Sequence, residues 1–513
     1  MRRVAVASVG AVLATAAALC GSAAPAAGSG PRAVADRTVI VTVRPGTRLP
    51  LAVPGVRVRA VFSRVSSEVV SGSASALSVL VRDPRVAGMS PNWSGRVTGW
   101  TPRVSHHTAG VLAADALGGD AGRPGVGAGV SVALLDTGVN DTPALNRASG
   151  RLVDGIDVCP LTTGGTPVFH GPYGDGYGHG TFIASLIAGG PVPGSHGDGV
   201  GVAPAAHIVD VKVANSQGQT SLLAVLAGMN WVAAHASTIS LANLSLSVTR
   251  PTSPAYGADP LTTAVDDLRA DGVLVVAAVG NTPGQVGDPG MDPQALTAGA
   301  ADTSGYGARV APFSGSGSVD GITKPDVVAP GVHMLSEMTP STEIAQENPN
   351  AWRDGLFLGS GTSEATAVTT GVAAAYLSAH PGSTPLAVKT AIRTAAVPID
   401  SSRGGAGLVS MGNRWGAHHP RGFDPSGEAG FDQATWTANS WLNGAWVDWL
   451  ASSWSASSWS ASSWSASSWS ASSWSASSWS ASSWSASSWS ASSWSASSWS
   501  ASSWSDAGWG DTG

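Results

Sequence analysis

The chain has 513 residues, of which 43% are hydrophobic and only 12% are charged, and its formal net charge is −6. This length and apolar content allow a sizeable core and more than one domain. The mildly acidic balance gives no electrostatic case for nucleic acid or an anionic membrane as a partner. With so few charges, the surface must be largely serine, threonine, glycine and asparagine, which suits an exported protein.

The N-terminus has the pattern of a cleaved export signal. Arg2 and Arg3 precede an apolar, alanine-rich run from Val4 to Leu19, and small residues follow at Ala24-Pro25-Ala26. The alternative is a membrane anchor, but the run is short for a membrane span and ends in serine, glycine and proline. We therefore expect a signal peptide over residues 1–26 and a secreted, extracellular protein.

Residues 33–95 form the next unit, which we expect to be a small α+β domain. Apolar runs and alternation predict strands over 39–43, 56–65 and 85–90, with a short helix over 73–81. The proline-containing stretch from Arg48 to Pro54 is a poor place for a helix.

From residue 105 to 412 the pattern changes to apolar runs separated by helical stretches. Strands are predicted over 130–135, 208–213, 239–246 and 273–278, and helices over 221–236 and 261–270. Continuous apolar strands spaced by helices indicate an α/β fold with a central parallel sheet covered on both faces. In such folds reactive residues gather beyond the carboxyl ends of strands and at helix N-termini.

Three short motifs in this region carry candidate catalytic groups. Asp136 ends an apolar strand in an Asp-Thr-Gly sequence, His179 lies at the start of a helical run, and Ser363 precedes another helix in a Gly-Thr-Ser sequence. Asp-Thr-Gly also marks aspartic proteases, and a second copy, Asp511-Thr512-Gly513, ends the chain. No apolar strand holds that copy against Asp136, so a two-aspartate dyad is disfavoured. The order Asp, His, Ser on a parallel α/β background is the specific signal.

Together these motifs resemble those of the subtilases, the subtilisin-like serine peptidases. Segments between the motifs also match that family: Gly127–Val130, Gly201–Pro204, Asn243–Leu246, Ala277–Asn281 and Lys324–Gly331. The resemblance implies a subtilisin-like catalytic domain with a central parallel sheet flanked by helices. It also implies a secreted serine endopeptidase of broad specificity that acts on proteins or peptides through an acyl-enzyme.

The resemblance assigns catalytic roles that side-chain chemistry supports. Ser363 is expected to attack the scissile carbonyl, with His179 as the base and Asp136 holding the imidazole. Asn281 is expected to stabilise the oxyanion together with the Ser363 backbone N–H. The chemistry requires no cofactor. Subtilases often bind calcium, but no Asp cluster here matches a specific site, so metal ligands stay unassigned.

Substrate is expected to bind as an extended strand. The edge segment that resembles the family's is Ser245-Leu246-Ser247, and the other side of the first pocket is Ala278-Val279-Gly280. Ser247 replaces a usual glycine, and we predict that it narrows the pocket against large aromatic side chains.

Two departures from the family pattern follow the nucleophile. Glu364 replaces an apolar residue and adds a carboxylate close enough to raise the apparent pKa of His179. Ala367 replaces a proline and, as a good helix former, should be harmless. Neither change removes a catalytic group.

The segments on either side of the catalytic domain carry separate expectations. Residues 33–95 resemble the subtilase propeptide, which implies an intramolecular inhibitor and folding assistant, removed by self-cleavage between about Asn92 and His107. After the domain come a tryptophan-containing linker at 413–450, eleven Ala-Ser-Ser-Trp-Ser repeats at 451–505 and a short tail at 506–513.

The repeats favour disorder, because a period of five gives no apolar stripe on a helix and puts neighbouring tryptophans on opposite faces of a strand. The alternative is adhesion, with the tryptophans stacking on cell-wall glycans and anchoring the protein at the cell surface.

Overall fold

The computed structural model describes residues 37–97, 99–100, 110–158, 174–192, 199–248, 258–304, 307–319, 321–399 and 401–411, together with short strands within 454–506. The chain has two compact units, residues 1–438 and residues 439–513. The predicted signal peptide, the tryptophan-containing linker and the second Asp-Thr-Gly sequence lie outside the described residues.

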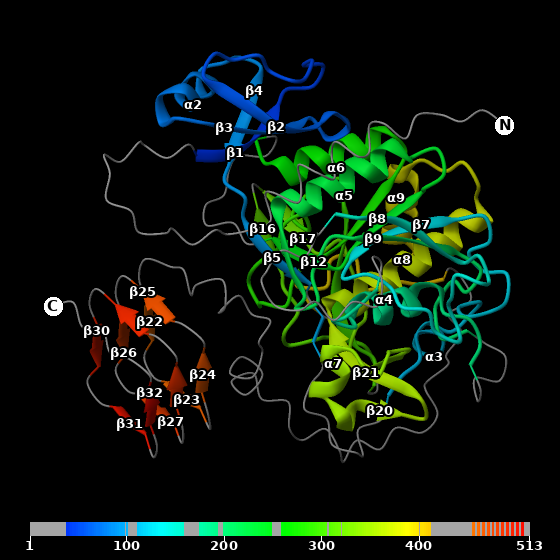
Figure 1. The fold of residues 1–513 in the computed structure, drawn as a ribbon. Helices are drawn as coiled ribbons and strands as arrows, with labels where there is room; N and C mark the ends of the chain where they lie inside the picture. The colour runs from blue at the N-terminus through cyan, green and yellow to red at the C-terminus, as the bar shows by residue number, and fades with distance from the viewer. Residues whose placement is uncertain are drawn as a thin grey trace. The chain divides into compact units, whose positions relative to one another are not determined.

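Residues 37–90 form a small α+β sandwich, as the sequence predicts (Figure 1). Its antiparallel sheet has the order β2-β3-β1-β4 and one helix packs against it. The elements are β1 (Arg37–Val43), β2 (Val56–Phe62), β3 (Ser67–Gly72), α2 (Ala74–Val81) and β4 (Val86–Ser90).

Helix α2 begins where Ser73 accepts a hydrogen bond from the Ala76 N–H. The strand predicted through Val65 ends earlier, at Phe62, because Ser63–Val65 form a 3-10 turn, η1, that closes through Ser66 in the left-handed region.

The second part of the first unit is built on an eight-stranded sheet with the order β15-β14-β13-β11-β7-β9-β8, in which β18 also pairs with β14. All pairs are parallel except that of β14 with β15. This confirms the predicted α/β fold. The strands are β7 (Ser131–Asp136), β8 (Leu152–Asp157), β9 (His207–Lys212), β11 (Leu241–Leu244), β13 (Leu274–Ala278), β14 (Leu296–Asp302), β15 (Arg309–Val310) and β18 (Val327–Pro330).

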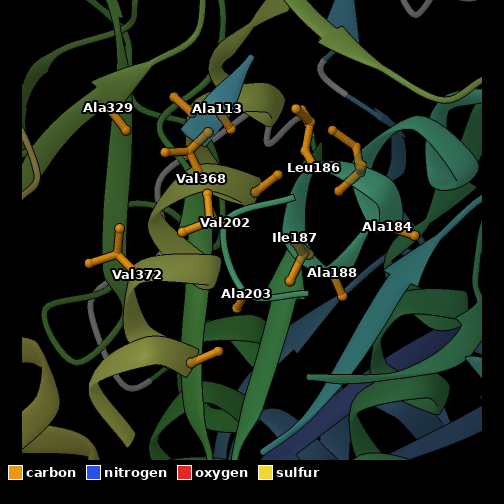
Figure 2. Close-up of a cluster of buried hydrophobic side chains, with 14 of the residues drawn as sticks. Ala113, Ala184, Leu186, Ile187, Ala188, Val202, Ala203, Ala329, Val368 and Val372 are labelled. Carbon is orange, nitrogen blue, oxygen red and sulfur yellow. The ribbon is translucent and has the colours of Figure 1, made fainter. Parts of the chain in front are cut away.

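Helices cover both faces of this sheet. One face packs against α4 (His179–Ala188), α8 (Thr362–Ala379) and α9 (Pro385–Ala395). Figure 2 shows Val368 and Val372 of α8 and Ile187 of α4 in this core, with Val202 between them in the view. The other face packs against α5 (Leu222–Ala234) and α6 (Pro260–Ala270). The apolar cluster on that second face also contains Ile40, Phe62, Val65 and Val69, so the small N-terminal sandwich shares it.

Smaller sheets and helices surround the central layers. The strands are β5 (Ser94–Val97), β6 (Gly99–Trp100), β10 (Gln219–Ser221), β12 (Leu246–Val248), β16 (Gly317–Val319), β17 (Ile322–Lys324), β19 (Met334–Ser336), β20 (Trp352–Arg353) and β21 (Leu356–Gly361). The helices are α3 (Ala113–Leu117), α7 (Glu343–Glu347) and the 3-10 turn η2 (Pro349–Ala351).

The strand predicted over 239–246 is divided, because the chain leaves the central sheet after Leu244 and joins the β5–β10–β12 sheet from Leu246. Within the described residues, no helix is both long and apolar enough to cross a membrane.

The repeat region forms the second unit. Strands β22–β32 recur every five residues, from Trp454–Ala456 to Trp504–Asp506. Each pair is parallel and joins residues twenty apart, as in Trp454 opposite Trp474. The expectation that the repeats lack regular structure is therefore wrong for these strands. That expectation considered each repeat alone, whereas four repeats make one turn that brings identical residues into register.

Candidate active site

Asp136 and His179 form a buried pair. Asp136 is the last residue of β7 and His179 the first of α4, with 1% and 3% of their surfaces exposed. Asp136 Oδ1 lies 2.7 Å from His179 Nδ1 and also accepts the Thr137 N–H at 2.8 Å. Because a carboxylate only accepts hydrogen bonds, the pair places the imidazole proton on Nδ1 and leaves Nε2 as the basic nitrogen.

Asp175 holds the start of α4 in place. Its Oδ1 accepts the Gly178 N–H at 2.6 Å and the Thr137 hydroxyl at 2.9 Å, and its Oδ2 accepts the Thr181 N–H at 2.8 Å. A carboxylate at a helix N-terminus satisfies backbone donors and suits the helix dipole. Sequence reasoning gave Asp175 no role, although it lies in the same glycine-rich motif as His179.

The electrostatic setting of His179 favours its charged form. Burial alone would lower the pKa of the imidazole, but the charge and hydrogen bond of Asp136, with Glu364 and Asp175 further away, outweigh burial and raise that pKa above its ordinary value. The predicted influence of Glu364 on His179 is therefore present as one of several carboxylate effects.

Ser363 lies in the first turn of α8 and is fully buried. Its hydroxyl donates to the carbonyl oxygen of Ser245 at 3.0 Å. His179 Nε2 has no hydrogen-bond partner among the described residues. The conformation thus brings base and nucleophile to one site without the hydrogen bond between them that the triad hypothesis expects. Rotation about the Ser363 Cα–Cβ bond is what would redirect the hydroxyl.

Asn281 lies next to the start of α8. Its Oδ1 accepts both the backbone N–H and the hydroxyl of Thr362, each at 2.9 Å. With Oδ1 engaged in this way, the donor group of the Asn281 side chain is Nδ2.

Glu364 is an unusual neighbour for these groups. It is fully buried beside Ser363, and its Oε2 has no hydrogen-bond partner among the described residues. Burial raises the pKa of Glu364 to about 7, although the charge of His179 opposes that shift. Near neutral pH this carboxyl therefore exchanges between its neutral and charged forms.

The predicted pocket segments lie at adjoining strand ends. The Ser245 hydroxyl donates to Asn243 Oδ1 at 2.9 Å, and Val248 N–H donates to the Asp288 carbonyl at 3.0 Å. On the other side, Val279 accepts the Gly287 N–H and Gly280 accepts the Gly315 N–H, each at 2.8 Å. The Ser247 side chain lies against Gly287, where a Cβ would clash with its hydroxyl. Leu246 and Ala278 are fully buried.

The chain's own strand β5 lies along this edge. It pairs antiparallel with β12 on one side and with β10 on the other. Sequence reasoning identified the β12 edge but missed β10, a short polar strand without an apolar pattern. Both edges together form a channel that takes one extended chain.

The described residues contain no group of three or more His, Cys, Asp or Glu side chains placed to hold a metal ion. The calcium expectation thus gains no candidate ligands in this part of the chain, and it stays a prediction.

Comparison with known proteins agrees with the geometry. A model of the subtilase family matches residues 127–429. The chain is 32% identical over 304 residues to serine protease AprX of Bacillus subtilis (strain 168), covering 56% of this chain and 66% of that protein. It is 32% identical over 287 residues to subtilisin Savinase of Lederbergia lenta, covering 55% and 90%. It is 33% identical over 278 residues to a cuticle-degrading serine protease of Arthrobotrys oligospora, covering 53% and 57%.

The matched part therefore spans somewhat under two thirds of two of these relatives and nine tenths of the third. Asp136, His179, Asn281 and Ser363 all lie within the range of residues that the family model covers. The chain belongs to the subtilase family of serine-type endopeptidases.

Proposed function

We propose that this chain is a secreted endopeptidase that hydrolyses protein and peptide bonds through an acyl-enzyme on Ser363. The observation that carries the proposal is the buried Asp136–His179 contact of 2.7 Å, placed beside the helix N-terminus that bears Ser363. A fixed tautomer, a basic Nε2 and a hydroxyl on a neighbouring helix are the parts that acyl transfer needs.

The mechanism begins when the Ser363 hydroxyl turns from the Ser245 carbonyl toward His179 Nε2. Its oxygen then adds to the scissile carbonyl carbon while its proton moves to Nε2. The C–N bond breaks as that proton passes to the leaving amine, which leaves the acyl group on Ser363. Water then gives a proton to Nε2 and adds its oxygen to the acyl carbon. As the bond between that carbon and Ser363 Oγ breaks, Nε2 returns the proton to Oγ, and the acid product departs.

Charge on the carbonyl oxygen develops in both tetrahedral intermediates. Asn281 Nδ2 and the Ser363 N–H are the donors we assign to this oxygen, and Thr362 keeps the Asn281 side chain oriented. Loss of one side-chain donor of this kind reduces the stabilisation of the transition state by about 2.7–4 kcal/mol, a range measured on subtilisin itself.

The proposal includes synthesis as a zymogen with broad substrate preference. Residues 37–90 share an apolar cluster with α5 and α6, and the strand that follows them lies in the channel between β10 and β12. Pairing with the substrate backbone on two edges does not depend on the substrate's side chains, which supports a broad substrate preference.

Casein hydrolysis tests the reaction. Purified wild-type protein should hydrolyse casein and lose its N-terminal segment, whereas Ser363→Ala should be inactive and remain at full precursor length. A Ser363→Ala protein that hydrolyses casein as fast as the wild type would refute the proposal.

The repeat unit supports a second, separable function in anchoring. Its parallel strands pair each tryptophan with the tryptophan twenty residues further on. Tryptophan therefore recurs at the same backbone position along the unit, and tryptophan is a residue type that can stack on a sugar ring. We propose that the repeat unit binds cell-wall glycan. Deletion of residues 439–513 should move active enzyme from the cell fraction to the medium, and unchanged partitioning would contradict anchoring.

A further inference from the structure

Strand β5 fills the channel between β10 and β12 as one extended chain. Burial alternates along this strand, with Gly95 and Val97 buried and Ser94 exposed. Gly95 stands opposite Thr220 of β10 and Val248 of β12, so its position is paired on both sides. A substrate that binds here as an extended strand must place one of its residues between the same two partners.

The other end of the pairing between β5 and β12 shows which way the bound chain runs relative to the nucleophile. Val97 stands opposite Leu246. The residue before Leu246 is Ser245, whose carbonyl oxygen accepts the Ser363 hydroxyl at 3.0 Å. A substrate bound in the register of β5 is therefore cut on the C-terminal side of the residue that takes the place of Val97.

Gly95 has no room for a side chain. A Cβ at this position would lie 2.7 Å from the Ser247 carbonyl oxygen and 3.1 Å from both Thr220 Cγ2 and Val248 Cα. The φ angle of Gly95 is not in the left-handed region, so other residues can adopt its backbone conformation. The restriction to glycine therefore comes from the close approach of the two neighbouring strands.

The β12 wall of this position is held by a second segment of the chain. Val248 is bridged to Asp288 and donates its N–H to the Asp288 carbonyl at 3.0 Å. The Ser247 side chain lies against Gly287, whose N–H donates to the Val279 carbonyl at 2.8 Å. Because β12 is fixed by these contacts, it cannot move away from β5 without breaking them.

The β10 wall is fixed through Thr220, which is buried. Its hydroxyl donates to the Val213 carbonyl at 2.8 Å. Val213 in turn donates its N–H to the Asp136 carbonyl at 2.9 Å, which ties this wall to the end of β7. The hydroxyl bond holds the side-chain conformation that places Thr220 Cγ2 next to Gly95.

We propose that Thr220, Ser247 and Val248 form a subsite that selects glycine in the substrate, two residues before the residue that stands opposite Leu246. This inference rests on the proposed function and specifies the substrates of the same site. It adds one requirement to a preference that is otherwise broad, because the remaining paired positions are recognised through the backbone.

Quenched peptides with the sequence of residues 92–100 test the subsite on the active enzyme, with casein hydrolysis measured in parallel. We expect Gly95→Ala in the peptide to lower kcat/KM by at least about tenfold and Gly95→Val to lower it further. The control peptide carries Ser94→Thr, which also adds one methyl group but at an exposed position. Its kcat/KM should stay close to that of the parent peptide.

Mass spectrometry of the products locates the cut and separates the possible results. Equal kcat/KM for the glycine, alanine and valine peptides would overturn the subsite, as would no cut of the glycine peptide or a cut before Val97. In each of these cases, casein hydrolysis leaves the proposed function standing. An enzyme that hydrolyses neither casein nor any peptide would overturn the proposed function, and the subsite with it.

Variants of Thr220 test whether its methyl group excludes the side chain. Thr220→Ser removes only Cγ2 and keeps the hydroxyl that donates to Val213. We expect it to lower the kcat/KM ratio of the glycine peptide to the alanine peptide by about threefold. Part of the preference should remain, because the Ser247 carbonyl is unchanged.

Thr220→Val is the matched control, because it keeps Cγ2 and loses the hydroxyl. It should retain the wild-type ratio of the two peptides. A wild-type ratio in Thr220→Ser, or an equal fall of the ratio in both variants, would overturn the assignment of Thr220 to the subsite.

Discussion

At the scale of single residues, Glu364 is the feature that most distinguishes this site. It combines complete burial, an oxygen without a partner among the described residues and a pKa of about 7. Its ionised form strengthens the charged state of His179, which must be neutral to act as a base. The pH dependence of catalysis should therefore differ from that of a site with an apolar residue in this place.

Glu364→Gln tests this through the pH profile. Removing the carboxylate lowers the pKa of His179, so the acid limb of kcat/KM should move to lower pH. The folded-state pKa of Glu364 is raised, so the stability of the wild type declines as pH rises from about 4.5 through about 7. The variant should therefore gain stability above pH 7, by up to roughly 3 kcal/mol. An unchanged acid limb and an unchanged unfolding curve would contradict this role.

Ser247 gives a second residue-scale prediction. Its side chain fills space against Gly287, beside the wall formed by Val279. Ser247→Gly should raise kcat/KM for peptides with phenylalanine before the scissile bond, relative to alanine, by roughly tenfold. Equal cleavage after phenylalanine and alanine by the wild type would remove the basis for this prediction.

At the scale of elements, local pattern predicted the apolar strands and amphipathic helices well. Strands β7, β9 and β13 and helices α5 and α6 lie where their patterns place them, because their burial is a property of each segment. The break at Ser245 was missed, since it depends on contacts with Ser363 of α8, 118 residues away. Strand β10 was missed because its pairing partner β5, not its own sequence, makes it a strand.

In the candidate site too, local motifs predict some features and contacts between distant segments determine the others. The residues of the proposed triad and Asn281 were predicted from motifs, but the side-chain conformation of Ser363 and the hydrogen bonds of Asp175 could not be predicted. Both are set by partners that meet only in the folded chain, such as the Ser245 carbonyl and the Thr137 hydroxyl.

Helix α4 provides the element-scale prediction. Gly180 packs directly on the Gly138 carbonyl, so a Cβ there would clash with backbone. Gly180→Ala should displace the start of α4 from β7, costing about 1–3 kcal/mol in stability and reducing kcat with it. The control Gly317→Ala, whose Cβ would meet only ordinary contacts at 3.4 and 3.7 Å, should behave as wild type. Full activity and stability of Gly180→Ala would contradict the packing argument.

At the scale of the whole molecule, the N-terminal sandwich and the strand after it engage the surface of the large domain together. The Arg64 N–H donates to Asn230 Oδ1 at 3.0 Å, and the Leu223 N–H of α5 donates to Asn92 Oδ1 at 2.9 Å. Parallel sheets fold slowly because their contacts are distant in sequence. A segment that caps α5 and shares its apolar cluster offers a template for that slow step.

Asn92→Ala tests this coupling in the uncleaved Ser363→Ala precursor. Loss of a hydrogen bond at the first turn of α5 should lower the free energy of unfolding by about 1 kcal/mol. Asn350→Ala is the control, an exposed asparagine whose backbone carbonyl, not its side chain, accepts from Arg353. Equal stability of both variants would show that the Asn92 contact does not couple the two parts.

The most direct test of the central claim is covalent labelling with a fluorophosphonate, followed by intact mass and peptide mapping of the processed enzyme. We predict one label, on Ser363, that is absent in Ser363→Ala and strongly slowed in His179→Ala, because labelling requires a serine activated by its base. Labelling at another residue, or labelling of Ser363 at an unchanged rate in His179→Ala, would contradict the account.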